Sequence, residues 1–233
     1  FVTVGGVGTI LTSFDGSSWT ERISGTSKRL NGVTFGNNIF VTVGESGTIL
    51  TSQDGNSWSQ KTSENTQASL TGATYGNEIF VVVGLSGTIL TSKDGTTWTK
   101  RNSGTQLLLN DVIFENKIFV TVGESGIILT SKDGISWSKR NTFLTDKSLY
   151  SVTYGNGKFV AVGWGHKGSS IIYTSHDGIY WKTQRIGEIF EYLNGVTFGK
   201  GIFVTVGEWK EILISSDGTN WTQRTFGLSN RLN

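Results

Sequence analysis

The sequence predicts an all-β protein, a β-propeller built from four-stranded antiparallel blades. The first observation is a motif, Ser-x-Asp-Gly-x-x-Trp, which occurs six times with successive tryptophans 39, 40, 39, 44 and 40 residues apart. The second is that each interval contains short runs of β-branched and aromatic residues, separated by turns rich in glycine and asparagine. A fixed period of this size is typical of repeat architectures, and the runs are typical of an antiparallel meander.

One repeat, residues 30–69, indicates how a blade forms. Residues 30–35 and 39–43 are rich in strand-forming side chains and flank the turn residues 36–38. Residues 48–52 form a third such run, and the more polar residues 58–61 follow the Asp-Gly turn. No helical period is long enough to compete. Each repeat is therefore expected to fold as four short antiparallel strands.

Stacking explains how these meanders become stable, because one meander cannot bury both of its faces alone. The small, mostly glycine-containing first strands are expected nearest the axis: residues 30–35, 70–75, 109–114, 149–154 and 193–198. The second strands are continuous apolar runs, which indicates burial on both faces. They comprise residues 40–43, 80–83, 119–122, 159–162 and 203–206.

We expect one domain over residues 1–233, with six repeats of about 40 residues and six blades. The alternative is a fragment of a ring with seven or more blades. The sequence begins with Phe1-Val-Thr-Val4, which matches a second strand, and ends with Arg231-Leu-Asn233, which matches the beginning of a first strand. The C-terminal strand is therefore expected to close the N-terminal blade and remove an exposed sheet edge.

The composition excludes several classes of function. Twenty basic and eighteen acidic residues give a formal charge of +2, so nucleic acid is not an expected partner. The absence of cysteine and the presence of only two histidines exclude thiolate chemistry and Cys- or His-rich metal sites. No metal or cofactor is expected. No apolar run approaches the roughly 20 residues of a membrane-spanning helix.

The repeated motif is expected to be structural, because every copy keeps it. Its aspartate can accept hydrogen bonds from the backbone of its own turn, and its glycine permits a turn geometry that a Cβ would oppose. Its tryptophan can pack on the hairpin or on the neighbouring blade. The residues concerned are Asp15, Trp19, Asp54, Trp58, Asp94, Trp98, Asp133, Trp137, Asp177, Trp181, Asp217 and Trp221. Calcium binding and catalysis are the alternatives for the six carboxylates.

The motif resembles the Asp-box (BNR) repeat of many propeller blades. The whole unit places Phe-Val-Thr-Val-Gly before Thr-Ile-Leu-Thr-Ser-x-Asp-Gly-x-x-Trp and is similar to bacterial propellers of the photosystem II assembly-factor (Ycf48/HCF136) type. The resemblance covers nearly the whole chain and implies the propeller fold. It implies little about function, because propellers with such repeats include sialidases, receptors and assembly factors. Family habit favours a secreted or cell-surface location.

The arginines argue against an enzyme of the sialidase type, whose active site resembles a cluster of three unique arginines. Here Arg22, Arg101, Arg140 and Arg224 each follow a motif tryptophan by three residues, and Lys61 takes that position in the second copy. Arginines at the same position of successive repeats indicate a structural role in each blade, and not a single active site. A glycoside hydrolase that uses two carboxylates is the less favoured enzymatic alternative.

Specificity is expected in the loop after the second strand, because this loop varies. It reads Gly-x-Ser-Gly in the middle repeats and changes at residues 163–170 and 207–211, which contain the only two tryptophans outside the motif. Exposed aromatic residues are common binding contacts. The candidate binding residues are Trp164, His166, Tyr192, Glu208, Trp209 and Lys210. A non-catalytic binding or scaffold module for a protein partner is favoured, because these tryptophans occur in only two blades. A lectin-like, glycan-binding propeller is the alternative.

Overall fold

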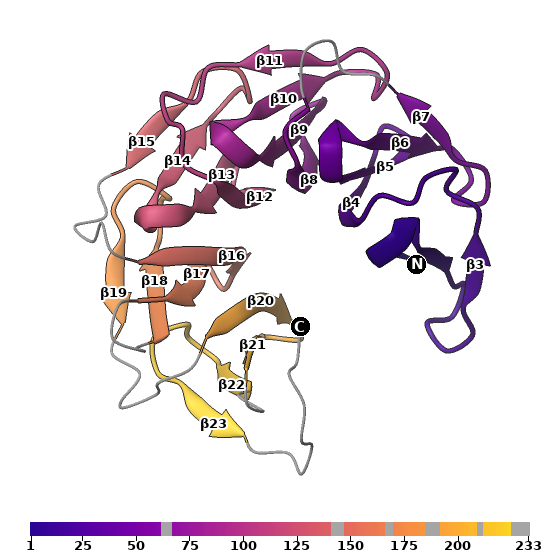
Figure 1. Cartoon of the computed structure of the whole chain (residues 1–233). Coiled ribbons are helices and arrows are strands. Elements are labelled where there is room, and N and C mark those ends of the chain that lie inside the picture. The colour runs from indigo at the N-terminus through magenta and orange to yellow at the C-terminus, as the bar shows by residue number, and fades with distance from the viewer. Residues whose placement is uncertain (62–66, 141–146, 166–169, 185–191, 209–211, 225–233) are drawn as a thin grey trace. The chain divides into compact units, whose positions relative to one another are not determined.

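The computed structural model describes residues 1–61, 67–140, 147–165, 170–184, 192–208 and 212–224, which form short strands joined by tight turns (Figure 1). The chain divides into two compact units. Unit 1 contains Phe1–Phe119 and Ser131–Trp137, and unit 2 contains Val120–Thr130 and Ser138–Asn233. The single domain expected from the sequence stays a prediction. Within these described ranges, no helix has the length and apolar character needed to cross a membrane.

Each of the six repeats forms one antiparallel sheet in which consecutive strands are neighbours. The first sheet has three strands among the described residues: β1 (Val2–Val4), β2 (Ile10–Thr12) and β3 (Thr20–Arg22). The next two sheets have four strands each: β4 (Leu30–Gly36), β5 (Ile39–Gly44), β6 (Ile49–Ser52) and β7 (Ser59–Lys61), then β8 (Leu70–Gly76), β9 (Ile79–Gly84), β10 (Ile89–Ser92) and β11 (Thr99–Arg101).

The last three sheets repeat this order. They contain β12 (Leu109–Glu115), β13 (Ile118–Gly123), β14 (Ile128–Ser131) and β15 (Ser138–Arg140), then β16 (Ser148–Gly155), β17 (Lys158–Trp164), β18 (Ser170–Ser175) and β19 (Lys182–Gln184), and finally β20 (Leu193–Gly199), β21 (Ile202–Gly207), β22 (Ile212–Ser215) and β23 (Thr222–Arg224). The four-stranded meander predicted from each repeat is therefore confirmed in five sheets. Residues 231–233 lie outside the described residues, so the predicted closing strand remains untested.

The third and fourth strands of a repeat begin one residue later than predicted. Thr48 precedes β6 because its N–H closes a 3₁₀ turn on the Glu45 carbonyl at 3.1 Å. Trp58 precedes β7 because its indole Nε1 donates to the Gly55 carbonyl, which makes it part of the motif turn. The 3₁₀ turns η1 (Gly6–Gly8), η2 (Glu45–Gly47), η3 (Leu85–Gly87) and η4 (Glu124–Gly126) occupy the Gly-x-Ser-Gly loops and the matching loop near the N-terminus.

Sheets of unit 1 approach closely along their first strands. Strands β4, β8 and β12 lie beside one another, whereas β7 and β11 lie on the opposite side of the unit (Figure 1). A Cβ added to Gly32 would lie 3.3 Å from Gly72 Cα, and one added to Gly72 would lie 3.4 Å from Asp111 Cα. The predicted crowding of these strands is therefore confirmed here. It is not seen at Gly195, where Val206 Cγ2 at 3.7 Å is the nearest atom.

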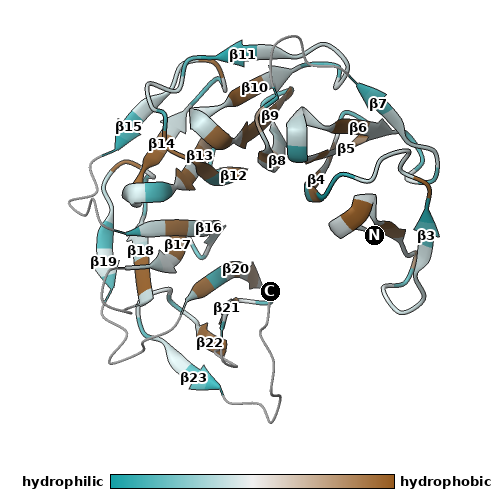
Figure 2. Ribbon diagram, in the orientation of Figure 1, coloured by the Kyte–Doolittle hydropathy of each residue, from teal (hydrophilic) through white to brown (hydrophobic). Residues whose placement is uncertain are grey.

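The second strands form the core, as predicted. The apolar side chains of residues 80–83, 119–122 and 159–162 are fully buried, together with the Thr121 side chain. In β5 and β21 the prediction is wrong in detail, because Phe40, Val204 and Val206 are only half-buried, whereas Phe203 and Thr205 are buried. Figure 2 shows the resulting gradient, with hydrophobic strands inside each sheet and the hydrophilic strands β7, β11, β19 and β23 at the sheet edges.

Candidate binding surface and the repeated turns

Each Ser-x-Asp-Gly-x-x-Trp turn is held together by its own side chains. In the copy at Asp54, Oδ1 accepts hydrogen bonds from Ser52 Oγ at 3.0 Å and from the backbone N–H groups two and three residues further on at 2.8 and 2.9 Å. Ser52 Oγ in turn accepts the Gly55 N–H at 2.8 Å. Gly55 has φ +73°, a left-handed conformation that favours glycine. The predicted structural role of this turn therefore has a direct geometric basis.

The other five copies make the same contacts, and these contacts keep the carboxylates ionised. The N–H groups of each turn lower the pKa of its aspartate, because they stabilise the charged form. At Asp133, the Ser136 N–H is the main cause, and the pKa falls to about 2. Among the described residues, no three His, Cys, Asp or Glu side chains gather where they could hold a metal ion.

The motif tryptophans pack on their own sheets. Five of the six lie against the phenylalanine that begins the apolar run of the second strand, with ring centroids 6.3 Å apart for Phe40 and Trp58 and 6.4 Å apart for Phe80 and Trp98. Trp98 and Trp181 are 7% and 8% exposed, whereas Trp19 is 43% exposed. The motif tryptophan is therefore buried in two copies, half-buried in three and exposed in the first.

The arginines that follow the motif tryptophans by three residues bind the third strand of their own sheets. Arg22, Arg101 and Arg140 donate Nε to the threonine hydroxyl ten residues earlier, at 2.7–2.8 Å. Gln184 makes the equivalent bond to Thr174 at 2.7 Å. These arginines therefore serve one sheet each and do not gather into one cluster within either unit. Lys61 occupies the same position in the second repeat but makes no such bond.

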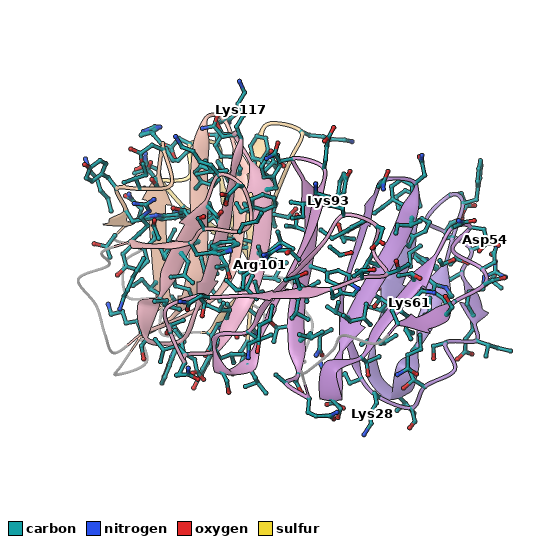
Figure 3. The ribbon with its side chains drawn as sticks, turned by 90° about the horizontal axis from the view of Figure 1, so that it is seen from above. Lys28, Asp54, Lys61, Lys93, Arg101 and Lys117 are labelled. Atoms are coloured by element: carbon teal, nitrogen blue, oxygen red, sulfur yellow. The ribbon has the colours of Figure 1, made fainter. Side chains whose placement is uncertain are left out.

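The two ends of each sheet carry different sets of loops, as the sequence predicted. Asn37 and Asn77, in the turns after the first strands, donate to the Lys93 and Lys132 carbonyls in the motif turns of the following sheets. The motif turns and the turns after the first strands therefore share one end. Figure 3 shows this separation in unit 1, with Lys93 and Lys117 toward one end and Lys28 at the other.

Three of the six candidate binding residues lie together in unit 2, at the end opposite the motif turns. Strand β17 continues through Trp164, which pairs with Ser170 of β18, where the earlier sheets have a 3₁₀ turn. Tyr192 directly precedes β20, and Glu208 directly follows β21. His166, Trp209 and Lys210 lie outside the described residues, so their part of the prediction remains untested.

The side chains of Trp164 and Tyr192 stack. Their ring centroids are 4.5 Å apart and their planes differ by 8°, and both residues are half-buried. The Glu208 N–H donates to the Tyr192 carbonyl at 3.0 Å, as the Glu45 N–H does to the Arg29 carbonyl in the second sheet. Trp164 therefore packs on the sheet that follows its own, and Tyr192 is fixed by its ring and by its backbone. We call Trp164, Tyr192 and Glu208 the Trp164 surface.

The sequence indicated these residues but not the stack. Tyr192 occupies the repeat position of Arg29 and Ser69, immediately before the first-strand leucine. In the third sheet this position already contacts the variable loop of the preceding repeat, since the Ser46 N–H donates to Ser69 Oγ at 3.5 Å. An aromatic residue at both contacting positions was the signal that could have predicted the pair.

No family model and no curated protein matches the chain. Solved structures do match. A structure titled YCF48 bound to D1 peptide is 20% identical, covers 95% of this chain and 76% of its own, and has a TM-score of 0.73. YCF48 from Cyanidioschyzon merolae is 16% identical over 96% of this chain and 80% of its own, with a TM-score of 0.72. Virginiamycin B lyase from Staphylococcus aureus is 13% identical over 98% of this chain and 84% of its own, with a TM-score of 0.84.

These similarities, together with the six antiparallel sheets, show that the chain has the β-propeller fold predicted from its repeats. At such low identity they carry no residue role from those proteins to this one.

Proposed function

We propose that the chain is a non-catalytic binding or scaffold module that holds a protein partner at the Trp164 surface. The observation that carries this proposal is the stack of Trp164 on Tyr192, with centroids 4.5 Å apart, at a place where the repeat pattern is interrupted. Aromatic residues supply much of the binding energy of protein interfaces, especially when their rotamers are fixed before binding. A stacked pair meets this condition.

Two further observations support a binding role. The six motif aspartates are hydrogen-bonded to their own turns, which supports a structural role for these repeated carboxylates over a catalytic one. In addition, a propeller of similar structure has been solved bound to D1 peptide. A peptide segment is therefore the partner chemistry that we propose for the Trp164 surface.

A glycan is the alternative ligand, because a flat aromatic face can also cover the apolar face of a sugar ring. The Trp164 surface occurs once among the described residues, whereas a multivalent lectin would be expected to repeat its contacts in each blade. The single site therefore favours one protein partner.

The test is a selection of displayed peptides on the whole chain, followed by affinity measurements on two variants. Trp164→Ala removes half of the stack, and Tyr180→Ala removes an aromatic residue that is 77% exposed in the motif turn of the same sheet. We expect Trp164→Ala to weaken selected peptides roughly thirtyfold, the equivalent of about 2 kcal/mol, and Tyr180→Ala to change nothing. Equal affinities of both variants and wild type would refute the proposal. A glycan array that responds only to Trp164→Ala would favour the lectin-like alternative.

A further inference from the structure

A polar groove in unit 1 differs from its counterparts in other repeats. It lies between the motif turns of the sheets β4–β7 and β8–β11 and has a volume of about 420 Å³. Equivalent grooves beside Arg101 and beside Gln184 have volumes of about 270 and 300 Å³. Figure 3 labels Asp54 and Lys61, which belong to the same sheet of unit 1. The lining residues include Thr51, Asp54, Trp58, Ser59, Lys61 and Asp94.

The larger volume accompanies one substitution in the repeat. Arg101 and Gln184 extend over their strands to donate to Thr91 and Thr174, at 2.8 and 2.7 Å. Lys61 takes the equivalent position, but its side-chain ammonium group makes no hydrogen bond or ion pair with any residue that the structure describes. The Thr51 hydroxyl is left with Ser59 Oγ at 3.5 Å, a long contact. The groove therefore presents an ammonium group and two hydroxyls with hydrogen-bonding capacity to spare.

The same groove presents an aromatic wall. Trp58 lines it and is half-buried. By contrast, Trp98 and Trp181 are buried and do not line the grooves beside Arg101 and Gln184. The Trp58 N–H is already bonded to the Gly55 carbonyl at 2.9 Å. The groove is therefore bordered by the apolar ring and not by its donor group.

The chemistry of this lining selects among small ligands. Asp54 and Asp94 supply acceptors, Lys61 supplies donors, and the hydroxyls of Thr51 and Ser59 can do both. An anion would face two carboxylates, and an apolar molecule would leave these groups without partners. A sugar ring combines an apolar C–H face with hydroxyls that donate and accept. It fits a site of this size that has a few convergent polar groups.

We propose that this groove, which we call the Lys61 groove, binds one pyranose unit of a carbohydrate. The Trp58 ring covers the apolar face of the sugar, and Asp54, Lys61 and Thr51 bind its hydroxyls. The site is independent of the Trp164 surface, which lies in the other unit.

The test measures binding of a panel of methyl pyranosides (gluco, galacto and manno) to the whole chain by saturation-transfer NMR. Lys61→Arg keeps the charge and is expected to restore the bond to the threonine hydroxyl, which narrows the groove. Lys61→Met keeps much of the stem and removes the donors. We expect at least one pyranoside to bind wild type and to bind at least tenfold more weakly to both variants.

Two further variants serve as controls for the binding measurement. Trp164→Ala, in unit 2, is expected to leave pyranoside binding unchanged, and Arg101→Lys is expected to widen the groove beside it. The proposal is overturned if none of the pyranosides binds wild type, or if both Lys61 variants bind as tightly as wild type. Loss of binding in Trp164→Ala alone would also overturn it, because the sugar would then occupy the Trp164 surface.

Discussion

Gly36 provides a sharp test of how the sheets pack. This residue ends β4 and is buried, and a Cβ added to it would overlap Cγ and Cδ1 of Tyr75 in the next sheet and lie 2.5 Å from Tyr75 Cβ. Rotation of the Tyr75 ring does not move the Cβ of Tyr75, so it cannot relieve the contact between this atom and the added Cβ. The backbone of one strand must therefore shift. The ring is also packed on Phe80, with centroids 4.6 Å apart.

The expected cost of Gly36→Ala follows from two opposing effects. Overpacking of a well-filled interior costs about 1–3 kcal/mol, and the rigid contact places this site at the upper end. Replacement of glycine stabilises by about 0.4–1 kcal/mol through the unfolded chain. The net loss in the free energy of unfolding is therefore about 2 kcal/mol, or about 4–8 °C in Tm for a protein of this size.

Gly199 offers the matched control, because it ends β20 at the same repeat position and an added Cβ would meet no atom of the described residues within 4 Å. Gly199→Ala is expected to be neutral or slightly stabilising. Urea unfolding and thermal melting followed by circular dichroism compare the two variants. If Gly36→Ala is as stable as Gly199→Ala, the close packing of Gly36 on Tyr75 is refuted.

Asn31 Nδ2 donates to the Leu70 carbonyl at 2.8 Å, whereas Asn194 Nδ2 is buried without a partner among the described residues. Asn31→Ala should therefore cost about 1–2 kcal/mol in urea unfolding and Asn194→Ala almost nothing, and equal costs would contradict this. Asp133 has a lowered pKa of about 2, so its contribution to stability is present above about pH 4 and is lost as the pH falls toward 2. NMR titration of the Asp133 carboxyl near pH 4 would contradict this lowered pKa.

Much of the fold could be predicted because the repeat aligns equivalent residues. Residues 30–35 were predicted as a strand and form most of β4, and the apolar run 80–83 lies within β9, where it is buried on both faces. The local chemistry of the motif turn was also predictable, because Asp54 and Gly55 act within a few residues of each other. Contacts between sheets could not be read in the same way. Nothing in the sequence of 30–35 alone indicates that Gly36 must accommodate Tyr75.

The candidate sites show where alignment of the repeats predicts a functional residue correctly and where it does not. Alignment of the repeats identified Trp164 as a departure from the loop sequence of the other repeats, and Tyr192 was proposed with it. Their stack could not be predicted in this way, because it depends on two residues from different sheets. The same alignment led us to group Lys61 with the arginines, as a residue with the same structural role in every blade. The change from arginine to lysine matters in three dimensions, because the bond made by Arg101 is missing and the groove is wider.

The contacts between sheets of unit 1 run from each repeat to the next. The side chains of Asn31 and Thr71 donate to the carbonyls of the next first-strand leucines, and Gly36 and Gly76 lie under the next aromatic residues, Tyr75 and Phe114. A tandem duplication of about 40 codons would therefore bring both complementary surfaces with it. A gene of this kind can gain or lose a blade by unequal recombination without first evolving a new interface. Mutations on one side of such a contact are then selected together with changes one repeat further along the gene.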